Sequence, residues 1–107
     1  DHRMVCAAVT QVLAAMDETR PDLLYSVIPD SPGLAVPPGF SDWALTHPSL
    51  VTDRIGYEAL DLQAAGEALA CYESQFPAEA RAALVPMLHR EVWRGTVPFR
   101  LAFPHAF

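Results

Sequence analysis

Apolar residues recur at helical spacing in the first part of the chain. Val5, Val9, Val12 and Met16 follow one another at intervals of four, three and four residues. This spacing places them on one face of a helix, with Cys6 beside that face. Pro21 forces the residue before it out of the helical region, so the pattern predicts a helix over 2–19. We expect its apolar face to be buried.

The same spacing returns in the second half of the chain and predicts a helix over 56–76. Its apolar face consists of Leu62, Ala65, Leu69, Tyr72 and Phe76. Gly66 lies in the middle of this stretch, where glycine costs about 1 kcal/mol relative to alanine. The glycine indicates that another backbone passes close by. We therefore expect the alanine-rich first helix to pack antiparallel to the second.

A third apolar pattern predicts a helix over 78–94. Pro86 interrupts this pattern, so either the helix kinks there or one helix ends and another begins. Gly95 then stops the helix, because glycine readily adopts the left-handed conformation that ends helices. Three principal helices therefore account for the strongly periodic parts of the sequence.

Two proline-rich segments, 21–40 and 96–107, lack helical periodicity. The run from Pro29 to Gly33 is a strong turn signal, and a minor β-hairpin around Asp30–Gly33 is one option. Prolines would confine such a hairpin to an edge. The last segment holds three phenylalanines and is too apolar to be left in water. We expect both segments to be extended and to lie on a surface.

The expected fold is mostly α: one domain, 1–107, built as a small helical bundle with the two extended segments. A chain of 107 residues suffices for one hydrophobic core. The net charge is −6 and lysine and arginine form no cluster, which argues against nucleic-acid binding. We also expect no membrane span, because apolar runs are too short to cross a bilayer.

The two cysteines, Cys6 and Cys71, fall on or beside the two main helical faces. In an oxidising compartment they could form a disulfide between these helices, which would indicate a secreted or periplasmic protein. In a reducing compartment they would be small core residues of an intracellular protein. The sequence leaves both alternatives, and with them the localisation, open.

Candidate chemistry is sparse. His2 and Cys6 are four residues apart, so one hypothesis is that Cys6 is a thiolate nucleophile and His2 its base. The alternative is that His2 is a surface residue and Cys6 is buried or forms a disulfide. The four histidines share no metal-ligand spacing, and the chain has no glycine-rich phosphate loop. We therefore expect no metal, no cofactor and no assigned catalytic residue.

The run from Asp1 to Thr10, Asp-His-Arg-Met-Val-Cys-Ala-Ala-Val-Thr, resembles the nucleophile segment of the ribosomal-protein-processing cysteine proteases. The resemblance implies a cysteine hydrolase that uses Cys6. That family also has an N-terminal strand and a general-base histidine well upstream of the cysteine. This chain has neither, so the resemblance is confined to the segment around Cys6 and implies no general base.

The leading functional hypothesis is a non-enzymatic interaction module or accessory subunit that binds another protein through its apolar, proline-rich segments. Large exposed apolar patches usually mark interfaces. The predicted contact residues are Trp43, Phe99, Phe103 and Phe107. The alternatives are a disulfide-stapled binding or inhibitor protein and, third, the cysteine hydrolase.

Overall fold

The computed structural model describes residues 2–17, 19–34 and 44–104. In chain order the elements are α1 (His2–Ala14), β1 (Leu24–Ser26), a 3₁₀ turn (Pro48–Leu50), β2 (Asp53–Gly56), α2 (Ala59–Ala70), α3 (Ala78–Leu88), a π-helical turn (His89–Trp93) and β3 (Thr96–Leu101). The strands form one antiparallel sheet in the order β1-β3-β2. The prediction of a mostly α bundle is therefore wrong, and the fold is mixed α and β.

The last strand, β3, is the centre of the sheet. It pairs Tyr25 with Arg100 on one side and Ile55 with Val97 on the other. Pro98 lies inside this strand and is fully buried, although it has no N–H for the ladder. Its carbonyl still accepts the Val27 N–H at 3.4 Å. The proline-rich stretch 96–101 is thus extended, as expected, but its extended backbone is paired.

Strand β2 includes Gly56, where the sequence pattern predicts the start of the second helix. The second helix consequently begins at Ala59 rather than at 56. Asp61 marks this start, since its carboxylate accepts the Glu58 N–H at 2.8 Å in the manner of a capping box. Thr52 reinforces the strand pairing, because its hydroxyl accepts the Leu101 N–H at 2.7 Å.

The turn predicted between Pro29 and Gly33 is confirmed. The Leu34 N–H donates to the Ser31 carbonyl at 3.2 Å, and Gly33 has a φ of 76°. Within the described residues this turn joins no hairpin. Asp30 instead donates its N–H to the carbonyl of Thr46 at 2.8 Å, so the chain after β1 pairs with a segment further along the sequence.

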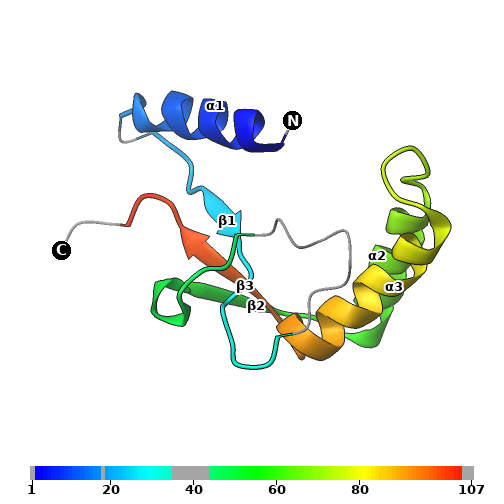
Figure 1. The fold of residues 1–107 in the computed structure, drawn as a ribbon. Coiled ribbons are helices and arrows are strands. Elements are labelled where there is room, and N and C mark those ends of the chain that lie inside the picture. The colour runs from blue at the N-terminus through cyan, green and yellow to red at the C-terminus, as the bar shows by residue number, and fades with distance from the viewer. Residues whose placement is uncertain (1, 18, 35–43, 105–107) are drawn as a thin grey trace.

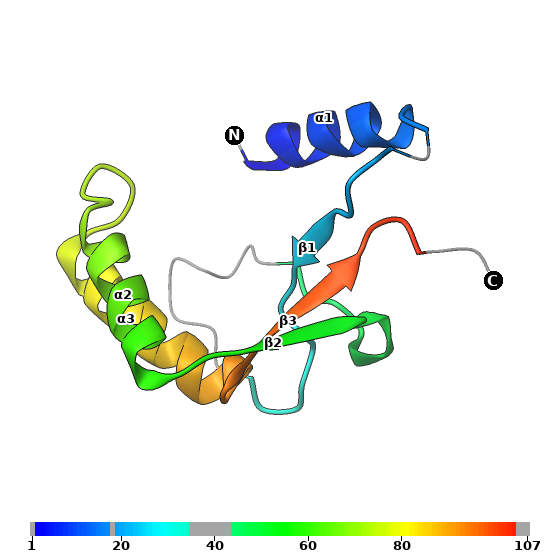
Figure 2. The same cartoon turned by 180° about the vertical axis from the view of Figure 1, so that it is seen from behind.

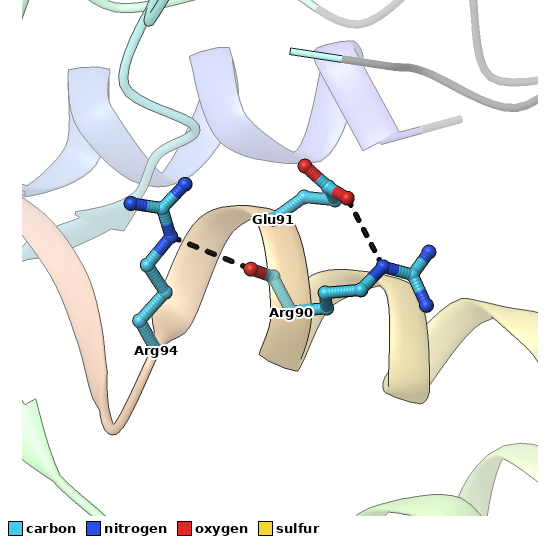
Figure 3. Close-up of polar contacts among 3 residues, drawn as sticks. All are labelled: Arg90, Glu91 and Arg94. Atoms are coloured by element: carbon cyan, nitrogen blue, oxygen red, sulfur yellow. Dashed lines mark hydrogen bonds and ion pairs between the residues drawn. The ribbon is translucent and has the colours of Figure 1, made fainter. Parts of the chain in front are cut away.

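Helix α3 passes through Pro86 and continues directly into the π-helical turn. Arg94 and Gly95 have φ angles of 50° and 107°, which confirms that the helical segment stops at Gly95. Figure 3 shows two polar contacts among the side chains and backbone at this end of the helical segment. Arg94 Nε donates to the carbonyl of Arg90 at 3.4 Å, and Arg90 Nε pairs with Glu91 at 3.0 Å.

The helices do not form a bundle. Helices α2 and α3 make an antiparallel hairpin that projects from one end of the sheet, whereas α1 lies beyond β1, away from this hairpin (Figures 1 and 2). The predicted antiparallel packing of the first helix on the second is therefore wrong for the single chain. The helix hairpin meets the sheet through the π-helical turn and β3.

The core of the chain is small. Among the described residues, only Val85, Met87 and Pro98 are buried. The accessible surface of the chain is 7932 Å², whereas a folded monomer of 11.7 kDa exposes about 5,900 Å². The radius of gyration is 15.5 Å, against about 13 Å for a compact domain of this length. The chain alone leaves much of its apolar surface in water.

Candidate functional site

Helix α1 turns its more polar side toward its own sheet. Arg3, Cys6 and Thr10 line a cavity of about 780 Å³ together with Tyr25 of β1. The Thr10 and Tyr25 hydroxyls are 2.7 Å apart, and the Thr10 hydroxyl is also 2.7 Å from the Cys6 carbonyl oxygen. Because the Thr10 proton goes to that carbonyl, Tyr25 donates to Thr10. This contact holds the helix by its polar side.

The apolar face of α1 points away from the rest of the chain. Val12 follows Thr10 by two residues, which is about 200° around a helix. The exposed fractions are 72% for Met4, 62% for Val5, 41% for Val9, 64% for Val12 and 40% for Met16. The sequence pattern identified four of these residues, and the structure adds Met4; we call the five together the α1 apolar face (Met4, Val5, Val9, Val12 and Met16). The expectation that it is buried is wrong for the single chain.

A groove of about 760 Å³ runs along the hairpin of α2 and α3. Small side chains and one glycine make up much of its lining: Gly66, Ala70, Ala78 and Ala82. A Cβ added to Gly66 would meet no atom within 4 Å. The expected close approach of another backbone to Gly66 is therefore absent within the chain. We call this feature the α2–α3 groove.

A hydrogen-bonded cluster closes the sheet end of this groove. The Gly95 N–H donates to the Tyr57 hydroxyl at 3.0 Å, and the same hydroxyl lies 2.5 Å from His89 Nδ1. The direction of the hydrogen bond between the Tyr57 hydroxyl and Nδ1 follows the tautomer of the imidazole. Trp93 packs edge-on against the Tyr57 ring, with 5.8 Å between centroids. The cluster ties the chain entering α2 to the turn that leaves α3.

A second, smaller cavity of about 380 Å³ carries mixed charge. Arg54 and Arg94 line it opposite Asp30 and Glu91. These groups belong to three different segments, but acidic and basic side chains balance one another there. Exposed ion pairs contribute little binding energy. The arrangement is therefore a weaker candidate than the two apolar surfaces.

Cys6 and Cys71 are both free and exposed, so the disulfide considered from the sequence is not formed. Cys71 Sγ instead lies 3.6 Å from the carbonyl of Glu67, one helical turn earlier. Within the described part of the chain, Cys6 makes no hydrogen bond with a histidine. The same residues hold no group of three or more histidine, cysteine or acidic side chains placed to bind a metal ion.

The predicted contact residues fall into two groups. Trp43 and Phe107 lie outside the described residues. Phe99 is half-buried in the central strand β3, where its carbonyl accepts the Thr52 N–H at 2.9 Å. Phe103 is also half-buried, with the Arg20 guanidinium 4.2 Å from its ring centroid. The structure thus brings Phe103 against the segment that precedes β1.

Sequence reasoning missed the outward direction of the α1 apolar face, although it found the residues. A period of 3.6 shows that one side of a helix is covered, but it does not show which chain covers it. The sequence did contain one indication of this orientation. Arg3 and Thr10, on the opposite side of α1, are polar enough to face a sheet edge or water.

Comparison with protein-family models, curated proteins and solved structures finds no match to this chain. Over the described ranges, no helix combines the length and apolar character that crossing a membrane requires.

Proposed function

We propose that this protein is a non-enzymatic interaction module, or accessory subunit, that binds another protein chain through the α1 apolar face. The observation that carries the proposal is the orientation of α1. Thr10 holds the helix to Tyr25 by its polar side, so Val5, Val9 and Val12 are presented to the surroundings. An amphipathic helix with this orientation is a common means of binding a hydrophobic groove.

The surface of the whole chain supports the same proposal. Its 7932 Å² exceeds the surface of a folded monomer of this mass by about 2,000 Å². Stable protein–protein interfaces bury about 800 Å² from each partner. The surplus exceeds this area, and Met4, Val5 and Val12 contribute exposed apolar side chains to it.

We assign the docking surface to α1 rather than to the proline-rich segments considered first. Within those segments, β1 and β3 use their backbone groups to pair with one another. Pro98 is buried and Phe99 is half-buried, so this part of the chain offers little free apolar area. The α1 apolar face, by contrast, has all five of its side chains at least 40% exposed.

Site-specific photo-crosslinking tests this proposal on the full chain. With p-benzoylphenylalanine at Val12, we expect a discrete crosslinked protein whose contact peptide can be mapped by mass spectrometry. The same probe at Gln11 is the matched control, because Gln11 lines the cavity between α1 and β1. Val5→Asp should abolish the Val12 crosslink while leaving the circular dichroism spectrum unchanged.

Three results would overturn the proposed function. They are the absence of a protein crosslink from Val12, equal crosslinking from Gln11, and a Val12 crosslink that persists in Val5→Asp. A crosslink to a second copy and a crosslink to a different protein both support the proposal, and their masses distinguish them.

A further inference from the structure

We propose that α1 folds and unfolds separately from the rest of the chain, and that binding of the partner chain completes its folding. The sheet and the hairpin of α2 and α3 stay folded while α1 opens, so only a fraction of the free molecules presents a finished α1 apolar face. This inference rests on the proposed function and adds its regulation: the stability of α1 sets the apparent affinity for the partner.

Helix α1 has little packing within its own chain. Of its 13 residues, only Thr10 and Leu13 are even half-buried. Among the described residues, no other helix or strand packs extensively on α1, and both views place it beyond β1, away from the helix hairpin (Figures 1 and 2). Helices in proteins are stabilised mainly by packing, and isolated helices shorter than about 12–15 residues are marginal in water. Helix α1 therefore lacks the main source of helix stability.

The side of α1 that faces β1 borders a cavity of about 780 Å³ instead of a continuous layer of packed side chains. The Thr10–Tyr25 hydrogen bond, at 2.7 Å, joins the two elements there. A hydrogen bond of this kind offsets only a small part of the conformational entropy lost when a helix forms. The contact therefore orients α1 once the helix has formed, and shifts its folding only modestly.

The charges at the ends of α1 oppose the helix dipole, which favours acidic residues at the N-terminus and basic residues at the C-terminus. The first turn of α1 holds Arg3 and no acidic residue. The last turn holds no basic residue, and Asp17 follows shortly after it. Helix α2, with 12 residues, has nearly the same length but carries Asp61 in its first turn, within a capping box. The two helices therefore differ in end charges as well as in packing.

The boundary of the separately folding unit lies between the end of α1 and Arg20. In this connection the Arg20 N–H donates to the Asp17 carbonyl at 3.0 Å, a local bond that does not involve the sheet. The Arg20 guanidinium lies 4.2 Å from the centroid of the Phe103 ring, which anchors the chain before β1. Helix α1 can therefore open upstream of Arg20 while β1 remains paired with β3.

Coupling to binding follows from the position of the apolar side chains. A partner that covers Val5, Val9 and Val12 supplies the packing that α1 lacks within its own chain. Because this partner binds only the folded helix, it shifts the equilibrium toward that state. The apparent dissociation constant equals the intrinsic one divided by the folded fraction of α1. Any change that stabilises α1 alone therefore tightens binding.

Amide hydrogen exchange of the full chain tests the separate folding of α1. We expect amides of α1 to exchange at least about tenfold faster than those of α2, because opening α1 disturbs no other element. Val5→Ala should slow exchange in α1 about two- to threefold, because alanine has the higher helix propensity and the 62% exposed Val5 side chain has little packing to lose. Val85→Ala in α3 is the matched control. It removes a buried side chain and should speed exchange there at least about fivefold.

A pair of substitutions at His2 tests the coupling without touching the α1 apolar face. His2 is exposed in the first turn, where an acidic side chain stabilises the helix. His2→Glu should slow exchange in α1 about two- to fivefold. It should also raise the crosslink yield of the Val12 probe at a limiting partner concentration. His2→Lys is the matched control and should give neither gain. Slower exchange in His2→Glu with no gain in crosslinking would overturn the coupling.

The outcomes separate this inference from the proposed function. Equal exchange rates in α1 and α2, or faster exchange in α1 of Val5→Ala, would overturn the separate folding of α1. The proposed function would still hold in that case if the Val12 probe crosslinked a protein. A Val12 probe that crosslinks no protein would overturn the proposed function and the coupling together, whereas the exchange rates would still confirm or overturn the separate folding of α1.

Discussion

The hydroxyls of Thr10 and Tyr25 lie 2.7 Å apart, and this contact joins the middle of α1 to strand β1. Tyr25 is half-buried and sits opposite Arg100 in the sheet register. The bond attaches the helix by its polar side, and the valine side faces outward. The apolar side of α1 therefore faces the surroundings.

Removing this contact should loosen α1 without unfolding the sheet. A hydrogen bond of this kind contributes about 1 kcal/mol. We expect Thr10→Val to speed amide hydrogen exchange in α1 several-fold while exchange in β3 stays unchanged. Tyr25→Phe should have the same effect, and the double variant should be no worse than either single one. Additive effects of the two substitutions would contradict the bond between them.

The Tyr57 hydroxyl should be important for stability, because it accepts the Gly95 N–H and forms a hydrogen bond with His89. We expect Tyr57→Phe to lower the free energy of unfolding by about 1–3 kcal/mol, since the half-buried Gly95 N–H loses its acceptor. Urea denaturation measures the change. Tyr72→Phe is the control, because Tyr72 is 51% exposed and lies outside this cluster. Equal effects of the two substitutions would be inconsistent with the hydrogen-bonded cluster.

Gly66 should tolerate a small side chain in the middle of α2. Gly66→Ala should raise the free energy of unfolding by up to about 1 kcal/mol. The added methyl group meets no atom within 4 Å, so helix propensity decides the sign. Thermal or urea unfolding measures the change. A loss of stability would contradict the open space beside Gly66.

Both thiols should react in the native protein without a reducing agent. Cys6 and Cys71 are free and exposed, so native alkylation should add two groups to the intact mass. Reduction before alkylation should add no more. Cys6→Ser and Cys71→Ser should each lose one addition. A native mass that shows no addition until reduction would mean that the cysteines are bridged.

Asp17 should have a lowered pKa in the turn after α1. The Thr19 N–H donates to its carboxylate at 3.0 Å, and the Thr19 hydroxyl donates at 2.9 Å; both hold the pKa below the ordinary 3.8. Because the folded-state pKa is lowered, the turn is stabilised above the unfolded pKa and loses this stabilisation as pH falls through the folded pKa. Thr19→Val removes only the hydroxyl, so NMR titration should show a partial return toward 3.8.

Local features of this protein were predictable because neighbouring residues determine them. The spacing of Val5, Val9 and Val12 identified α1 and its apolar side. Gly33 and Gly95 marked a turn and a helix end, since both positions need a positive φ that glycine adopts easily. Each of these predictions concerns residues within about two helical turns of one another.

The tertiary structure decided everything that depends on distant residues. Val97 and Phe99 belong to a central strand only because β1 and β2 supply partners from far along the chain. The four residues of β2 are too few for a periodic signal, and Cys6 and Cys71 are free although both fit helical faces. Periodicity established that α1 has a side to bury. The direction of that side, away from its own sheet, followed from the Thr10–Tyr25 contact, which hydrophobic patterning does not encode.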